Sequence, residues 1–111
     1  LLLQSSGESP EHFEEALKSV SRAIEINSEI PKFYFNRAII KYNIKDLDGA
    51  MTDLTRILEL DENYSDALRQ RGSLFAELGI VPSACADWKK ASSLGDTRST
   101  NYLQENSEVC K

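Results

Sequence analysis

The feature that most restricts the fold of this chain is a sequence period of 34 residues. Alanine recurs at this spacing, as Ala16, Ala50 and Ala84. The same shift aligns three further columns: Val20, Leu54 and Trp88; Ala23, Ile57 and Ala91; Ile26, Leu60 and Leu94. Within a unit the columns are three or four residues apart, which places them on one face of an α-helix and fits no strand alternation. Each unit of the period therefore ends in a helix.

A second helix precedes this one in the two complete units. The small residues Ala38 and Gly72 lie in these preceding helices, where the paired helices must approach closely. Asp46 is suited to an N-cap, Gly79 to the end of a helix and Pro82 to a first turn. Together these signals predict helices at 11–27, 31–44, 47–60, 65–78, 82–93 and 97–106.

A two-helix unit of this length with small residues at fixed places resembles the tetratricopeptide repeat. The resemblance implies an all-α fold, a right-handed superhelical stack of antiparallel helix pairs with a C-terminal capping helix. As one domain, the chain would comprise a truncated first repeat at 1–30, a second at 31–64, a third at 65–96, and a capping helix with its tail at 97–111. Ile57, Ser28, Glu62 and Ser92 depart from the family pattern, which weakens individual contacts rather than the assignment.

The first repeat is expected to be incomplete. Leu1–Ser6, ended by Gly7, would be the last turns of its first helix, and Ser9 and Pro10 would start the second. Because the chain opens with leucine rather than methionine, we expect it to be a fragment or a processed product.

The family binds partners on the concave surface lined by the first helix of each pair. Carried over position by position, the resemblance assigns this role to Lys32, Phe35, Asn36, Ile39, Tyr42 and Asn43, and to Arg69, Gln70, Ser73 and Glu77, with Asp66 and Ala76 at two further lining positions. Phe35, Ile39 and Tyr42 form an apolar stripe. Either the stripe is open to a partner, or part of it packs against the missing helix of the truncated repeat.

One subclass of the family clamps the C-terminal carboxylate of chaperone tails with lysine, asparagine and arginine. Asn36 matches the middle asparagine of that clamp. However, Asp66 and Gln70 stand where the clamp has Lys and Arg, and a carboxylate at Asp66 would repel the tail. We therefore expect no binding of chaperone tails.

Charge and motif content restrict the function further. The net charge of -5 disfavours nucleic acid as a partner, and no apolar run is long enough to span a membrane. His12 is the single histidine, and the sequence holds neither metal-ligand spacing nor a glycine-rich phosphate loop. We predict no enzymatic activity and no cofactor. Arg37 and Arg71, one period apart, are expected to pair with acidic neighbours inside the fold.

The two cysteines, Cys85 and Cys110, leave two possibilities open. Cys85 is expected on the side of its helix that meets the capping helix, and Cys110 follows that helix, so a disulfide is geometrically possible. The alternative is two free thiols. Free thiols would fit the cytoplasm, whereas a bridge would imply an extracytoplasmic location.

The sequence thus predicts a protein–protein interaction module that binds a peptide or helix of another protein. Phe35, Ile39 and Tyr42 would bury apolar side chains of the partner, and the polar groove residues would orient it. An alternative is a scaffold that forms homodimers or larger oligomers through its open N-terminal face, with Leu1–Leu3, Phe13 and Leu17 at the contact.

Overall fold

The protein, seen in a computed structural model, is described from residue 10 to residue 111, with side chains from residue 12 onward. The predicted stub at Leu1–Gly7 lies outside these residues. Over the described residues the secondary structure is entirely helical, and every predicted helix is present with its ends within one residue of the prediction. The chain divides into two compact units, one ending at Asp61 and one beginning at Glu62. None of the described helices combines the length and apolar character needed to cross a membrane.

The first unit contains α1 (Pro10–Ile26), α2 (Pro31–Asn43) and α3 (Leu47–Leu60). Proline at the first position of α2 presets a helical φ and removes an N–H that would have no partner there. Asp46 caps α3, as predicted, because its carboxylate accepts a hydrogen bond from the Gly49 amide at 2.9 Å. The turn before it places Lys45 at a φ of 67°, in the left-handed region.

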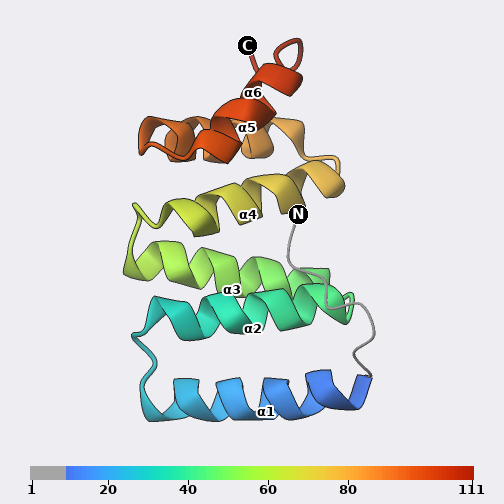
Figure 1. The fold of residues 1–111 in the computed structure, drawn as a ribbon, viewed down its shortest axis with the longest axis vertical. Helices are drawn as coiled ribbons and strands as arrows, with labels where there is room; N and C mark the ends of the chain where they lie inside the picture. The colour runs from blue at the N-terminus through green and yellow to red at the C-terminus, as the bar shows by residue number, and fades with distance from the viewer. Residues whose placement is uncertain (1–9) are drawn as a thin grey trace. The chain divides into compact units, whose positions relative to one another are not determined.

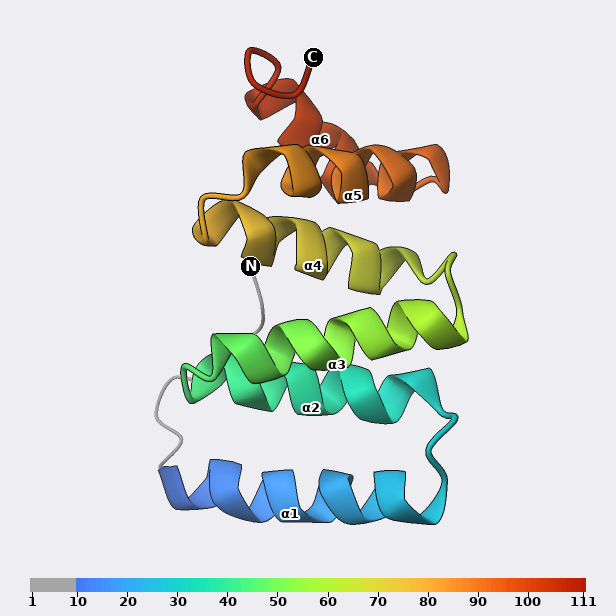
Figure 2. The ribbon, with the colours of Figure 1, turned by 180° about the vertical axis from the view of Figure 1, so that it is seen from behind.

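Helices α2 and α3 pack side by side as a hairpin (Figures 1 and 2). Their shared core is made of fully buried side chains: Ala38, Ala50, Leu54 and Ile57. Tyr34 is also buried, and its hydroxyl donates to the carbonyl of Ser28 at 2.9 Å, which fixes the turn that enters α2. The apolar columns of the sequence are thus the seam of the helix pair.

Helix α1 packs against α2, yet its own columns are less buried. Ala16 is exposed, and Ala23 is half-buried. Their counterparts one period later, Ala50 and Ile57, are fully buried by the helix pair. In the described residues, α1 therefore presents to solvent the face that α3 buries.

The second unit contains α4 (Ser65–Glu77), α5 (Val81–Ser93) and α6 (Thr97–Glu105). Helices α4 and α5 form a second hairpin, and its turn places Gly79 at a φ of 78°, one period after Lys45. Gly72 permits close packing in this hairpin. A Cβ there would lie 2.8 Å from the Cδ1 and Nε1 atoms of Trp88 and 3.2 Å from the Ala84 carbonyl oxygen.

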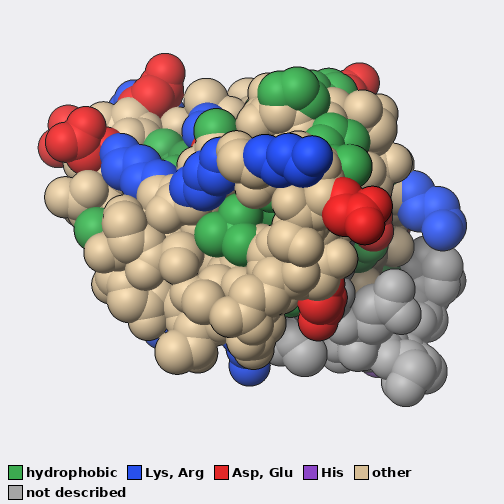
Figure 3. Space-filling view, turned by 90° about the horizontal axis from the view of Figure 1, so that it is seen from above, with side chains coloured by type: hydrophobic (Ala, Val, Ile, Leu, Met, Phe, Trp, Pro, Cys, Tyr) green, Lys and Arg blue, Asp and Glu red, His purple; other side chains and the backbone are tan. Residues whose placement is uncertain are grey.

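Helix α6 packs on α5 as the predicted capping helix (Figure 1). Its first turn is held by Asp96, whose carboxylate accepts from the amide and the hydroxyl of Ser99 at 3.0 and 2.6 Å. Its far end is held by a disulfide between Cys85 and Cys110, whose Cα atoms are 5.3 Å apart. Seen from the α6 end, apolar side chains are interspersed with charged ones (Figure 3).

Candidate functional site

The predicted groove residues of α2 lie on a partly open face of the first unit. Lys32 and Asn36 are exposed, and the apolar stripe of Phe35, Ile39 and Tyr42 is half-buried. Asn43 closes the helix end by donating from Nδ2 to the carbonyl of residue 39 at 2.9 Å. The stripe can therefore be reached by solvent.

Most of the predicted groove residues of α4 are more deeply buried than those of α2. Arg69, Gln70 and Ser73 keep no more than 8% of their surface exposed, whereas Glu77 is exposed. The Oε1 atom of Gln70 is buried without a hydrogen-bond partner. A buried acceptor of this kind costs free energy until it meets a donor.

Arg69 is bound to two carboxylates. Its Nη1 atom lies 3.0 Å from Asp66 and 2.7 Å from Asp96, and the second carboxylate is the one that caps α6. Burial of the Asp96 carboxyl acts to raise its pKa, but hydrogen bonds from Ser99 and the charge of Arg69 outweigh this and lower the pKa below 3.8. Arg69 therefore fixes the start of the capping helix.

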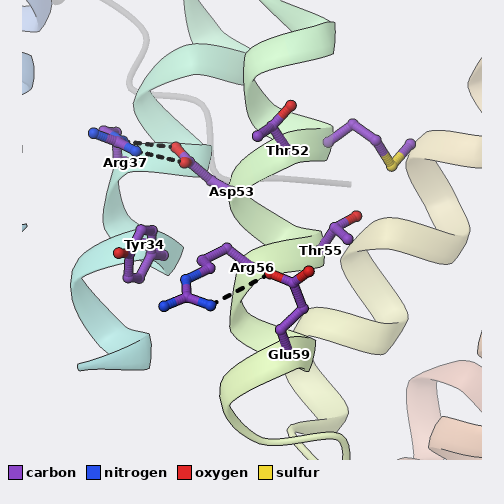
Figure 4. Close-up of a pocket in the computed structure, with 8 residues that line it drawn as sticks. Tyr34, Arg37, Thr52, Asp53, Thr55, Arg56 and Glu59 are labelled. Carbon is purple, nitrogen blue, oxygen red and sulfur yellow. Dashed lines mark hydrogen bonds and ion pairs between the residues drawn. The ribbon is translucent and has the colours of Figure 1, made fainter. Parts of the chain in front are cut away.

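The expected pairing of Arg37 and Arg71 is confirmed. The guanidinium of Arg37 donates to both oxygens of Asp53 at 2.9 and 2.8 Å (Figure 4). One period later, Arg71 donates to both oxygens of Asp87 at 2.8 and 2.9 Å. Hydrogen bonding to the carboxylate is the largest cause of the raised pKa of each arginine. Each bidentate pair links the two helices of one hairpin.

A hollow of about 380 Å³ opens between α2 and α3 beside the first of these pairs. Figure 4 shows its lining side chains, which are Tyr34, Arg37, Met51, Thr52, Asp53, Thr55, Arg56 and Glu59. Its charges are matched within the hollow, because Arg37 pairs with Asp53 and Arg56 lies 3.4 Å from Glu59. Such a surface offers no unbalanced charge to a ligand.

A second hollow, of about 400 Å³, lies in the other unit. It is lined by Ser73, Ala76, Glu77, Trp88 and Tyr102. The rings of Trp88 and Tyr102 lie 5.4 Å apart at an angle of 49°, and the indole Nε1 donates to the Ser73 hydroxyl at 3.4 Å. Three predicted lining residues of α4 thus meet two aromatic side chains that sequence reasoning had assigned to the core and the cap.

The two cysteines adopt the bridged alternative. Lys89 adds a second contact to the same tail by donating from Nζ to the carbonyl of Lys111 at 2.8 Å. Among the side chains described from residue 12 onward, no three histidine, cysteine, aspartate or glutamate residues are grouped as metal ligands.

No protein-family model matches the chain. Serine/threonine-protein phosphatase 5 from Homo sapiens is 31% identical over 77 residues, which are 69% of this chain and 15% of the phosphatase. DnaJ homolog subfamily C member 7 from Homo sapiens is 26% identical over 99 residues, which are 89% of this chain and 19% of that protein. The chain therefore spans less than a fifth of the length of either relative.

Two solved structures share the fold. MamA matches with a TM-score of 0.75 at 19% identity, over 88% of this chain and 60% of MamA. The first TPR (tetratricopeptide repeat) of Spaghetti (RPAP3), bound to the HSP90 peptide SRMEEVD, matches with a TM-score of 0.79 at 22% identity, over 89% of this chain and 80% of that one. The predicted all-α fold of a TPR solenoid is confirmed by these matches. The chain therefore has the fold of a tetratricopeptide-repeat solenoid, and its helix pairs recur with a period of 34 residues.

Proposed function

We propose that the chain is a protein-interaction module that binds an extended or helical segment of another protein. Phe35, Ile39 and Tyr42 of α2 bury apolar side chains of the partner. The polar residues Lys32, Asn36 and Asn43 of the same helix orient it. The observation that carries this proposal is the half-buried apolar stripe on α2, flanked by exposed Lys32 and Asn36.

Two further observations support a bound segment. The solved Spaghetti TPR has this fold and holds a peptide. In this chain, Gln70 stands at a predicted lining position, and its buried Oε1 atom accepts no hydrogen bond. A backbone N–H of a bound segment would supply the missing donor.

A pair of matched variants tests the stripe. Phe35→Ala removes an aromatic side chain from it, and Phe33→Ala removes the same side chain from the same helix at a position outside it; both residues are half-buried. Proteins captured from the source cell by the unaltered chain are then measured against each variant, with helicity checked by circular dichroism. We expect Phe35→Ala to weaken binding about tenfold or more, as for a central aromatic contact. Equal losses for both variants would contradict the stripe as the binding site.

The chemistry of the partner differs from that of chaperone tails. Asp66 is exposed, and the adjoining basic residue, Arg69, is held by Asp66 and Asp96. The C-terminal carboxylate of a tail would therefore meet a like charge rather than a free cation. We expect the peptide SRMEEVD to show no saturable binding in isothermal titration at neutral pH. Saturable binding that is lost with Asn36→Ala would overturn this expectation.

A second candidate function is self-association through α1. Ala16 is exposed, whereas its counterparts Ala50 and Ala84 are buried to 1% exposure or less. Phe13 and Leu17, also predicted at this contact, are half-buried, while Leu1–Leu3 lie outside the described residues. Sedimentation equilibrium over a range of concentrations tests this candidate. Ala16→Glu should hold the chain at monomer mass if α1 is the contact, and an unchanged dimer would exclude this helix.

A further inference from the structure

The surface formed by α5, α6 and the C-terminal tail carries a group of basic side chains. Figure 3 shows Lys and Arg side chains in a row across this surface. The bases of this part of the chain are all exposed and are called the basic row below: Lys89 and Lys90 on α5, Arg98 on α6 and Lys111 in the tail. The whole chain carries a net charge of -5, so the basic row runs against the average charge of the protein.

The basic row lacks a matching carboxylate. Asp87 and Asp96 belong to the same region, but their charges are taken up by arginines of α4: Arg71 binds Asp87, and Arg69 binds Asp96. Within residues 12–111, no aspartate or glutamate forms an ion pair with the basic row. The repulsion between its like charges is therefore not compensated by a neighbouring acid.

Contacts of the tail fix part of the basic row in place. The disulfide from Cys110 to Cys85 anchors the tail to α5, and Nζ of Lys89 donates to the carbonyl of Lys111 at 2.8 Å. Lys111 is thereby held beside Lys89, although the two are 22 residues apart in the sequence. A surface that is in place before a partner arrives loses less affinity to ordering than a flexible one.

Two exposed apolar side chains flank the basic row. Leu94 is 42% exposed and follows Lys90 by one helical turn. Val109 is 61% exposed, and its carbonyl oxygen lies 3.9 Å from Sγ of Cys85, which precedes Lys89 by one turn. The surface therefore offers apolar area for burial next to charges that can orient a partner.

We propose that the basic row binds an acidic segment of a partner protein, with apolar residues of that segment against Leu94 and Val109. Carboxylates of the segment accept hydrogen bonds from the three lysine ammonium groups and from the guanidinium of Arg98. This surface belongs to the second unit, whereas the stripe of the proposed function belongs to the first. The proposal therefore adds a second interaction surface to the stripe.

The charges beside the basic row favour a short acidic segment over a nucleic acid. Glu105 and Glu108 are exposed and line a hollow of about 370 Å³ together with Val109. A nucleic acid carries a phosphate at every nucleotide, so it would extend from the four bases onto these carboxylates. An acidic segment can end where the basic row ends. The peptide SRMEEVD matches poorly, because its arginine offsets one of its carboxylates and would meet like charge.

Two matched peptides test the proposal. Acetyl-Leu-Glu-Glu-Glu-Glu-Leu-amide carries four carboxylates between two leucines, and the control peptide has glutamine at all four positions. Proton–nitrogen correlation spectra of the full chain, recorded during each titration, report both the affinity and the residues in contact. We expect the glutamate peptide to bind about tenfold more tightly at about 0.02 M salt, with amide shifts centred on the basic row. At about 0.5 M salt, screening should bring the two affinities within about twofold of each other.

Two double variants with the same change in net charge locate the binding surface. Lys90→Glu with Arg98→Glu reverses two charges of the basic row and should abolish the preference for glutamate. Lys18→Glu with Arg22→Glu reverses two exposed bases of α1 and should leave the affinity within about twofold. None of these four side chains forms an ion pair or a hydrogen bond within residues 12–111, so both variants should fold, as circular dichroism can verify.

Three outcomes would overturn the proposal. The first is equal affinity of the two peptides at low salt, and the second is an equal loss of binding in both double variants. The third is binding of oligothymidylate or of phosphatidylserine vesicles at least as tightly as the glutamate peptide, because the basic row would then recognise negative charge of any kind. A captured partner that depends on Phe35 would leave the proposed function standing in each case. Conversely, a glutamate preference without such a partner would keep the basic row and remove the α2 stripe.

Discussion

The Arg71–Asp87 pair gives the sharpest test of how the hairpins are held together. The Asp87 side chain is 9% exposed and the Arg71 side chain 23%, and two hydrogen bonds join them. Replacing Arg71 by methionine keeps an apolar stem near Phe75, whose ring lies 5.7 Å from the guanidinium carbon, but leaves a buried carboxylate without its partner. Losing one member of such a pair costs about 3–5 kcal/mol, and the partial exposure of Arg71 places our estimate at about 3 kcal/mol.

A double variant that replaces both Arg71 and Asp87 separates two contributions to stability: the attraction within the pair, and the cost of leaving Asp87 buried without its partner. Arg71→Met combined with Asp87→Leu replaces the pair by apolar side chains, and we expect it to lie within about 1 kcal/mol of the unaltered chain. Urea unfolding followed by Trp88 emission measures both variants, since Trp88 is adjacent to Asp87. Arg56→Met is the control, because its pair with Glu59 is exposed and is worth at most about 0.5 kcal/mol.

Either of two results would refute this reasoning. If the double variant is as unstable as Arg71→Met, the pair itself provides the stability and the unpaired charge is not the cause. If Arg71→Met is as mild as Arg56→Met, the Asp87 carboxylate is solvated, and the pair does not hold α4 to α5.

Three further predictions concern the turns and the cap. Gly79→Ala should cost about 1 kcal/mol and Lys45→Gly should stabilise by a similar amount in urea titrations, because both positions have a left-handed φ. The pKa of Asp96 is lowered, so its contribution to stability is present above pH 3.8 and is lost as the pH falls through the lower folded value. The difference in urea midpoint between the unaltered chain and Asp96→Asn should therefore shrink below pH 3.8. Cys110→Ser opens a bridge spanning 25 residues and should lower the stability reported by Trp88 by about 3 kcal/mol, an effect that dithiothreitol should reproduce in the unaltered chain.

Most of the fold could be predicted because its determinants are local and repeated. A cap such as Asp46 acts on the amide three residues later, and a left-handed turn at Gly79 involves only its own backbone. The 34-residue period then checks each helix against another copy. The period could not predict burial, because the burial of a repeat position depends on which helix covers it. Ala16 is exposed, although the same position is buried in the next two repeats.

The candidate site was less predictable because its parts come from different helices. The register predicts a groove position for Arg69, yet its guanidinium is held by Asp96, which is 27 residues further along the chain. Trp88 occupies a core column, and the position of Tyr102 beside it depends on how α6 packs. The size of Trp88 is a signal in the sequence that could have indicated this site. The same repeat position holds valine and leucine in the other repeats, so the larger indole must extend beyond the contact between the paired helices.

The repeated ion pairs also show where the first repeat differs. Asp53 and Asp87 are one period apart and each binds an arginine of its own hairpin, but the matching position of α1 is Ser19, which is exposed. A helix covering that face of α1 therefore needs no arginine there. It would meet small and apolar residues, such as Ala16 and Ala23, instead of a carboxylate that requires a partner. This face of α1 is consequently less selective in charge than the seams of the two complete hairpins, and shape and apolar area would decide what covers it.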